Sequence, residues 1–128
     1  MPETIEVEVD VQRRLIEVTV GGPLSLEFLW QVMAAVAETP DADPSFRLLF
    51  DGSALTLGES DARQLSVFEA GVPTHRDRLA IVAEGDLHYG FARMYEAWSE
   101  PEATRSVQVF RTRAEARDWL LEEMDLAN

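Results

Sequence analysis

The sequence feature that most constrains the fold is an uninterrupted apolar run from Leu79 to Ala83. A strand with one solvated face alternates apolar and polar residues, so a short apolar run without alternation is typical of a strand covered on both faces. Such strands lie at the centre of parallel sheets, because the crossover helices of these sheets cover both faces. The run therefore predicts an α/β domain with a central parallel strand.

Two stretches near the amino terminus do alternate, and each predicts a strand with one buried and one wet face. The first covers residues 5–10 and the second covers residues 15–20. The short polar segment between them predicts an antiparallel hairpin. The solvent face of the first strand is acidic, and Glu6 and Glu8 would discourage edge pairing with other molecules.

A helix is predicted from the N-cap residue Ser25 to about Glu38, after Gly21-Gly22-Pro23 ends the second strand. Its apolar residues fill an arc of about 160°, wider than the usual stripe of roughly 100°, and Phe28 lies outside this arc. One interpretation is a helix packed on the sheet with a neighbouring helix on its flank. The other is an exposed patch for a partner, a ligand or a second copy of the chain. The arc contains Leu26, Leu29, Trp30, Val32, Met33, Val36 and Ala37.

The remaining elements follow from apolar spacing, caps and turn residues. They are a strand from Phe46 to Phe50 followed by a turn at 51–53, a helix from Ser60 to Ala70, a helix capped by Asp86, a strand from Val107 to Phe110, and a helix opened by the capping box at 112–115. The predicted order is β-β-α-β-α-β-α-β-α. This is one domain over residues 1–128, an α/β fold with a single mixed, mostly parallel five-stranded sheet and four helices.

Composition excludes several classes of function. The chain has 11 basic residues, all arginine, and 24 acidic ones, for a formal net charge of −13, which disfavours binding to nucleic acid. The start lacks the pattern of a signal peptide and no apolar run is long enough for a transmembrane segment, so we expect a cytoplasmic protein. With no cysteine and two histidines, no metal and no cofactor are expected.

Three segments, in their order and spacing, carry a resemblance to a known family. They are RLLFDGSALTLGES, LAIVAEGDLHYGFARMYEAW and VQVFRTRAEARDWL, and with the first hairpin the resemblance covers residues 5 to about 121. The chain resembles the STAS/SpoIIAA-like domains, which are related in fold to sporulation anti-sigma-factor antagonists and to CRAL-TRIO lipid-transfer domains. The resemblance implies a SpoIIAA-like fold and a domain that binds rather than catalyses.

The antagonist branch of this family carries a phosphorylatable serine in an Asp-Ser-Ser-Gly stretch at the start of a helix. Glu59-Ser60-Asp61-Ala62 occupies that place here. Ser60 is retained, but Asp61 and Ala62 replace the second serine and the glycine. This departure argues against a kinase-operated switch, and the first interpretation of Ser60 is a helix N-cap.

Two functions remain open. The first is a non-enzymatic module for protein–protein interaction, whose unknown partner would contact the first helix and the loop from Asp51 to Asp61, with candidate residues Phe28, Trp30, Asp51, Ser53, Ser60 and Asp61. The second is a carrier or sensor of a small apolar, lipid-like ligand, in a pocket lined by Phe28, Trp30, Phe68, Phe91 and Tyr95. No motif positions a catalytic constellation, so an enzyme is not expected.

The strand order also brings charged residues together at the two edges of the sheet. Arg47, Arg78 and Arg105 precede or open strands, which places them at the amino edge. The opposite edge carries Asp51, Ser53, Glu84 and Asp86. Ligands of open α/β sheets usually bind at the carboxyl edge, and these acidic residues disfavour an anionic ligand there.

Overall fold

The computed structural model describes residues 3–56, 78–86, 88–90, 92–93 and 106–122. Its strands are β1 (Thr4–Asp10), β2 (Leu15–Pro23), β3 (Arg47–Thr56), β4 (Arg78–Val82) and β5 (Ser106–Phe110), and its helices are α1 (Leu26–Glu38) and α4 (Arg113–Leu121). Residues 86, 88–90 and 92–93 are also helical. The predicted helix from Ser60 to Ala70 lies outside the described residues.

The five strands form one mixed sheet in the order β1-β2-β3-β4-β5. β1 runs antiparallel to β2, and the pairings of β2 with β3, β3 with β4 and β4 with β5 are parallel. The α/β class and the five-stranded mixed sheet are thus confirmed. The apolar run that predicted a central strand lies in and just after β4, where Ala80 and Val82 are fully buried.

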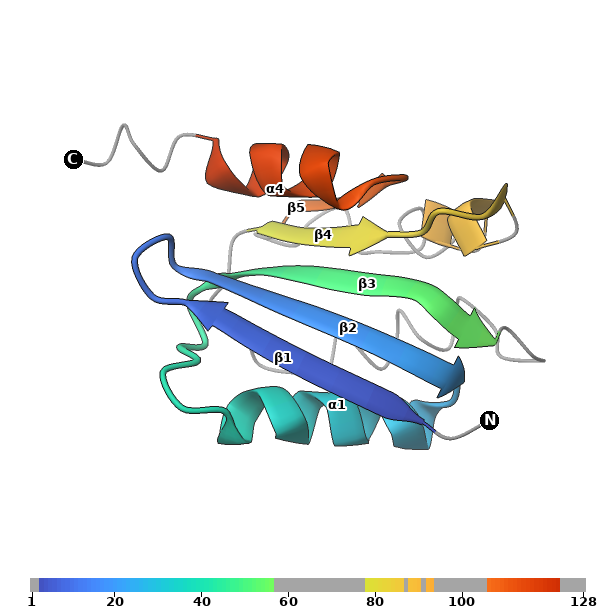
Figure 1. Ribbon diagram of the computed structural model, residues 1–128, viewed down its shortest axis with the longest axis horizontal. Coiled ribbons are helices and arrows are strands. Elements are labelled where there is room, and N and C mark those ends of the chain that lie inside the picture. The colour runs from blue at the N-terminus through green and yellow to red at the C-terminus, as the bar shows by residue number, and fades with distance from the viewer. Residues whose placement is uncertain (1–2, 57–77, 87, 91, 94–105, 123–128) are drawn as a thin grey trace.

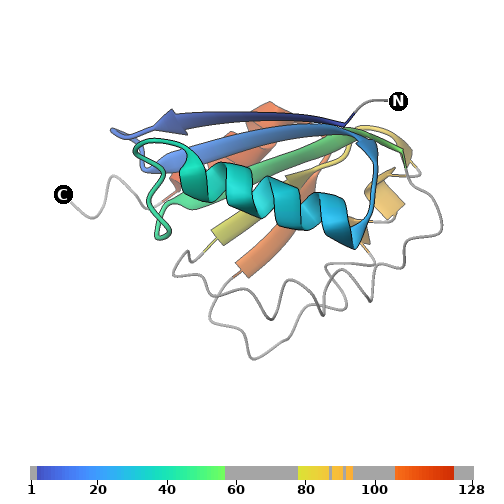
Figure 2. The ribbon, with the colours of Figure 1, turned by 90° about the horizontal axis from the view of Figure 1, so that it is seen from below.

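The two helices cover opposite faces of the sheet, α1 below β1 and β2 and α4 above β3, β4 and β5 (Figures 1 and 2). Alternation along β2 divides its side chains between these faces. On the α1 face, Ile16, Val18 and Val20 pack in the larger core cluster. On the α4 face, Leu15 joins Leu49, Ala80, Val82, Ala116 and Leu120.

α1 is rotated relative to the predicted apolar arc. Its most buried residues are Phe28, Val32 and Val36, at exposures of 0%, 3% and 5%. Phe28, which the helical wheel placed outside the arc, is therefore at the centre of the packed face. Trp30 and Ala37, which were predicted to be inside it, are exposed. The prediction was wrong because the wheel treats every apolar residue alike, whereas packing selects the stripe that fits against Ile16, Val18 and Val20.

The predicted end of the second strand at Gly21-Gly22-Pro23 and the predicted turn at 51–53 are also wrong. β2 runs on to Pro23 and β3 to Thr56, and these extensions pair with each other after a register shift between Thr19 and Gly21. Glycine suits this stretch, since Gly22 has φ 106° and a Cβ on Gly21 would lie 2.8 Å from Thr4 Oγ1. Strand pairing thus overrides residues that usually favour turns.

The helix starts that lie among the described residues were predicted to within one residue. Ser25 Oγ accepts a hydrogen bond from the backbone N–H of Phe28 at 3.0 Å, and Thr112 Oγ1 accepts one from Glu115 N–H at 3.2 Å. Asp86, predicted as a cap, is already helical, because Tyr89 N–H donates to the carbonyl of Gly85 at 2.8 Å. No helix among the described residues is long and apolar enough to cross a membrane.

Candidate functional site: the polar clasp and the carboxyl edge

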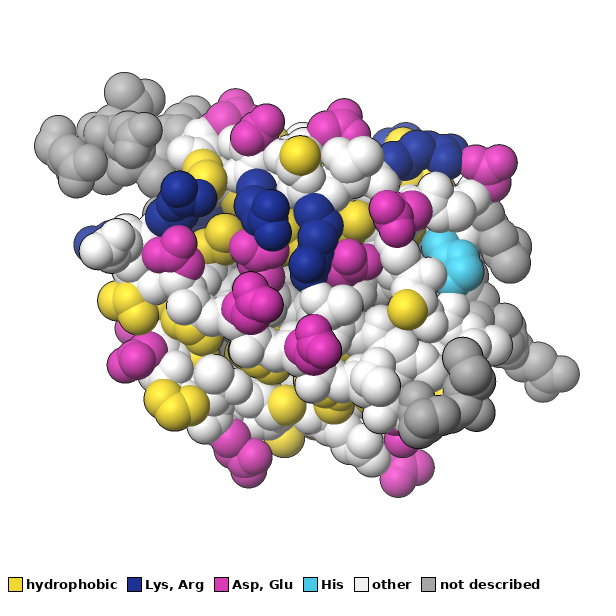
Figure 3. Space-filling view, viewed as in Figure 1, with side chains coloured by type: hydrophobic (Ala, Val, Ile, Leu, Met, Phe, Trp, Pro, Cys, Tyr) yellow, Lys and Arg dark blue, Asp and Glu magenta, His cyan; other side chains and the backbone are white. Residues whose placement is uncertain are grey.

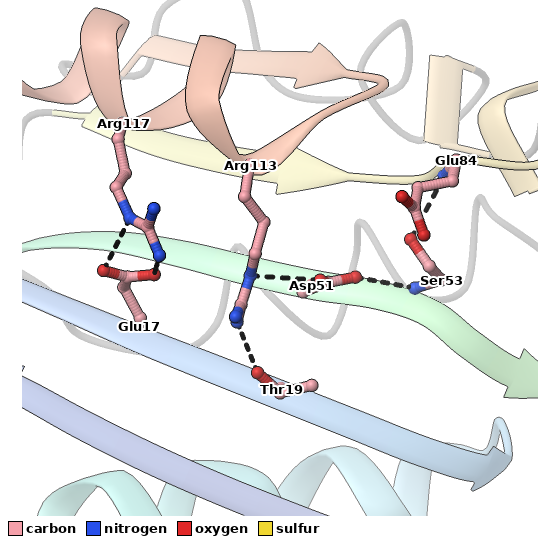
Figure 4. A network of polar contacts seen from close by, with 7 residues as sticks. All are labelled: Glu17, Thr19, Asp51, Ser53, Glu84, Arg113 and Arg117. Atoms are coloured by element: carbon pink, nitrogen blue, oxygen red, sulfur yellow. Dashed lines mark hydrogen bonds and ion pairs between the residues drawn. The ribbon is translucent and has the colours of Figure 1, made fainter.

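A group of charged and hydroxyl side chains holds α4 against the sheet (Figure 4). Arg113 and Arg117 are one turn apart on α4 and therefore project from the same face of the helix. Glu17 and Thr19 lie on β2, at positions whose side chains point toward α4, and Asp51 lies on β3. We call these residues, Glu17, Thr19, Asp51, Arg113 and Arg117, the polar clasp.

The Arg117–Glu17 pair is bidentate. Nε of Arg117 donates to Glu17 Oε2 at 2.9 Å and one terminal nitrogen donates to Oε1 at 2.8 Å. The side chain of Glu17 is 14% exposed and that of Arg117 is 40% exposed. This fork geometry is the strong form of an arginine–carboxylate contact.

The Glu17 carboxylate raises the pKa of the Arg117 guanidinium, mainly by this hydrogen bonding, and the charges of Glu17 and Glu8 add to the increase while burial opposes it. A raised pKa means that the folded state favours the charged form. The stabilisation is therefore complete below the pKa of the unfolded guanidinium and is lost only as the pH rises through the folded value. Arg117 therefore stays charged across the neutral range.

Arg113 bridges two strands. One of its terminal nitrogens donates to Thr19 Oγ1 on β2, and its Nε lies 3.2 Å from Asp51 Oδ2 on β3. That Nε is buried and its N–H is not aligned for a hydrogen bond, so the contact is an ion pair. Asp51 is 14% exposed, and its Oδ1 accepts the backbone N–H of Ser53 at 3.0 Å.

Beyond the clasp, several segments meet at the carboxyl edge of the sheet. Ser53 Oγ, within β3, accepts the backbone N–H of Glu84, which follows β4, at 3.1 Å. Arg111, which follows β5, pairs with Asp86 at 2.7 Å and stacks 4.2 Å from the ring centroid of Tyr89. The His88 ring contacts the carbonyl of Leu55. Glu84 and Asp86 thus follow β4 at this edge, as the sequence predicts. Asp51 and Ser53 lie within β3 instead of after it, with Asp51 beside Val82, the last residue of β4.

The two aromatic residues of α1 that were predicted to bind a partner or line a pocket point in different directions. Phe28 is 0% exposed and packs in the core, whereas Trp30 is 58% exposed. Phe28 and Trp30 are two positions apart in a helix, which places their side chains about 200° apart around its axis. Phe28 therefore offers no surface to a partner, and it cannot share a pocket with Trp30.

The other predicted site residues lie outside the described residues: Ser60, Asp61, Phe68, Phe91 and Tyr95. No group of three or more histidine, cysteine or acidic side chains among the described residues is placed to hold a metal ion.

At the amino edge, Arg47 and Arg78 are neighbours, because the next pair along β3 and β4 is Leu48 and Leu79. Both hold the carboxyl end of α4. Arg47 donates to the carbonyls of Leu120 and Glu122 at 2.6 and 2.8 Å, and Arg78 donates to that of Trp119 at 2.6 Å. Arg105, predicted to join them, lies outside the described residues.

Sequence reasoning missed two roles: that of Arg47 and Arg78 at the carboxyl end of α4, and that of Arg113 and Arg117 in the polar clasp. The signal for the amino edge is that α4 has no basic residue in its last turn, so the final carbonyls of the helix need donors from elsewhere. The signal for the polar clasp is that Arg113 and Arg117 each precede a buried residue, Ala116 and Leu120, by three positions. Arginines that flank a packed face can reach across it to the neighbouring strand.

The class of fold follows from a mixed sheet with an antiparallel first strand and helices on both faces. A scan against protein-family models finds no match, and a search of the curated proteins finds none either. Among solved structures, the chain is similar to an uncharacterized protein of the DUF3478 family with a SpoIIAA-like fold from Shewanella loihica PV-4. The two share 21% identity and a TM-score of 0.61, over 92% of this chain and 93% of that one. This protein therefore has the SpoIIAA-like fold, as the sequence resemblance implied.

Proposed function

We propose that this protein is a non-enzymatic binding module that engages a protein partner at the carboxyl edge of its sheet. The observation that carries the proposal is the exposure of Trp30, 58%, on a helix that starts at this edge. The start of α1 is fixed there because Leu24 N–H donates to the carbonyl of Thr56, the last residue of β3, at 3.1 Å.

The composition of the edge supports binding. Tryptophan, tyrosine and arginine dominate the energetically important positions of protein interfaces. Tyr89 and Arg111 stack on each other at this edge, and Arg111 is exposed. The acidic groups Asp51 and Asp86 are each paired with an arginine, which favours a binding module over acid–base chemistry.

The SpoIIAA-like fold adds support, since the sequence resemblance implies binding rather than catalysis. Ser60 and Asp61 remain predicted members of the same contact surface. Phe28 takes no part in this surface, because its side chain is buried.

The test uses two exposed apolar residues as a matched pair, Trp30 on α1 and Val11 on the hairpin turn, at 58% and 54% exposure. The protein serves as bait in a lysate of its source cells, and a captured protein is then purified and titrated by calorimetry. We expect Trp30→Ser to weaken binding about tenfold or more, as at interface hot spots, and Val11→Ser to leave it unchanged within about twofold.

Equal affinities of the two variants would show that Trp30 does not contact the partner, and the proposal would be wrong. Native mass spectrometry of freshly purified protein gives a second reading. A stoichiometric lipid-like adduct would favour the apolar carrier instead, and an adduct-free spectrum supports the binding module.

A further inference from the structure

The outer edge of β1 is a second surface, separate from the carboxyl edge. β1 is the first strand in the sheet order, and among the described residues it pairs with β2 alone. An edge strand directs half of its backbone N–H and C=O groups away from the sheet, where they can pair with another strand. β1 is seven residues long, long enough for a partner strand of ordinary length.

The two sides of β1 differ sharply in character. Ile5, Val7 and Val9 point toward α1 and are only half-buried against the core there. The opposite side carries four exposed residues, which α4 does not cover because it packs over β3, β4 and β5 (Figure 3). We call this side of β1 the hairpin face, and its members are Thr4, Glu6, Glu8 and Asp10.

The charges of the hairpin face are only partly balanced by described residues, because Asp10 pairs with Arg13 at 3.7 Å. Glu6 and Glu8 form no ion pair with the described residues, and Glu8 lies directly opposite Glu17 in the register. Like charges placed opposite each other on two strands are destabilising. Arg117 relieves the pair by binding Glu17, and its charge attracts Glu8 without a direct ion pair.

A hollow of about 390 Å³ adjoins this face. It is lined by three acidic residues, Glu8, Asp10 and Glu17, and by apolar residues that include Val11 and Leu15. Asp10 and Glu17 are already paired with arginines, so Glu8 is the acid of the hollow without a direct ion pair to a described residue. A lysine or arginine side chain fits this combination, because its aliphatic stem packs on apolar groups while its charged end meets the carboxylates.

A second copy of the chain does not fit the same edge. If β1 paired with β1, the acidic residues of both strands would lie on the same side and oppose each other. Such pairing would bury Ile5, Val7 and Val9 further, but it would also bring the acidic side chains of the two copies together. The charge pattern therefore selects a strand of opposite charge.

We propose that β1 binds an extended basic segment of a partner protein by strand addition. The segment alternates basic and apolar residues. Its basic side chains lie over Glu6, Glu8 and Asp10, one of them entering the hollow, and its apolar side chains complete the burial of Ile5, Val7 and Val9. Basic residues at every second position match the spacing of the acids, about 6.6–6.8 Å along a strand.

The probe is a fluorescein-labelled heptapeptide in which lysine and valine alternate, titrated by fluorescence anisotropy. A peptide with the same lysines and valines in two blocks has the same charge without the alternation. We expect the alternating peptide to bind the whole chain at least about fivefold more tightly than the block peptide, and to lose most of its affinity at about 0.5 M salt. Equal binding of the two peptides overturns the proposal.

Two double variants locate the site. Glu6→Gln with Glu8→Gln removes two charges from the hairpin face, and Glu27→Gln with Glu38→Gln removes two exposed charges from α1. We expect the first variant to weaken peptide binding about fivefold or more and the second to change it less than about twofold. Equal effects would mean that only the net charge of the protein attracts the peptide, and the strand-addition site would be discarded.

Backbone pairing has its own readout. A strand added at an edge bonds to its neighbour through alternate residues, so N-methylation of one alternate set of peptide residues must abolish binding while N-methylation of the other set preserves it. If both methylated peptides bind, or neither does, strand addition is wrong. None of these experiments involves Trp30, so their failure would leave the proposed function at the carboxyl edge untouched.

Discussion

The polar clasp and the hairpin face lie on the same side of the sheet and use the same kinds of side chain, yet their charges are arranged differently. In the polar clasp, Glu17 and Asp51 each meet an arginine of α4. On the hairpin face, Glu6 and Glu8 form no direct ion pair with a described residue, and Glu8 acts on Arg117 only through its charge. Paired, half-buried charges hold a helix in place, whereas unpaired, exposed charges remain available to a partner.

The largest expected effect is at Asp51. Asp51→Ala removes the partner of Arg113 and the acceptor for Ser53 N–H, and it leaves a buried Arg113 Nε without its counter-ion. We expect a loss of about 2–3 kcal/mol in the free energy of unfolding, measured by urea denaturation. Glu6→Ala on the hairpin face is the control, with a change below about 0.5 kcal/mol. Similar losses would erase the distinction between the two regions.

A smaller effect is expected at the amino edge, where Arg78 holds α4 by its last turn. Arg78→Ala deletes the hydrogen bond to the Trp119 carbonyl and the contact with the Trp119 ring at 4.9 Å. The expected loss is about 1–2 kcal/mol, with faster hydrogen exchange of the α4 amides. The control is Arg13→Ala on the hairpin turn, which breaks the 3.7 Å ion pair with Asp10, whose two side chains are 60% and 46% exposed. This substitution should lower the free energy of unfolding by less than about 0.5 kcal/mol. Unchanged exchange of α4 in Arg78→Ala would contradict the role given to this arginine.

The smallest effect is expected at the exposed ion pair of Asp86 with Arg111, which lies outside the polar clasp. Asp86 pairs with Arg111 at 2.7 Å, but its side chain is 93% exposed. Asp86→Asn should therefore change the free energy of unfolding by less than about 0.5 kcal/mol, because solvent screens exposed ion pairs. A loss above about 1 kcal/mol in calorimetric unfolding would place Asp86 among the structural charges.

The strands and the helix caps could be predicted because their signals are local. Alternation in residues 5–10 and 15–20 and the apolar run at Leu79–Ala83 report which faces are buried, and Ser25 and Thr112 act on N–H groups three residues away. The extension of β3 through Asp51, Gly52 and Ser53 could not be predicted in this way. Those residues favour turns on their own, and pairing with β2 keeps them extended.

The candidate sites were harder to predict, because their contacts join distant parts of the chain. Arg117 and Glu17 are 100 residues apart in sequence, and no local pattern reports their meeting. The choice between Phe28 and Trp30 as the exposed aromatic also depended on tertiary structure. A helical wheel cannot tell which of two apolar stripes fits the sheet, and here the packed stripe is the one centred on Phe28, Val32 and Val36.

Glu8 and Glu17 provide the most direct test, since they face each other across β1 and β2 and belong to opposite sides of the comparison. The same substitution in each, Glu8→Gln and Glu17→Gln, is followed by urea denaturation at neutral pH. Loss of the Arg117 contacts predicts a decrease of about 1–2 kcal/mol for Glu17→Gln. Relief of like-charge repulsion predicts no loss, or a gain of a few tenths of a kcal/mol, for Glu8→Gln. Equal destabilisation by the two substitutions would contradict the assignment of structural charges to the polar clasp and available charges to the hairpin face.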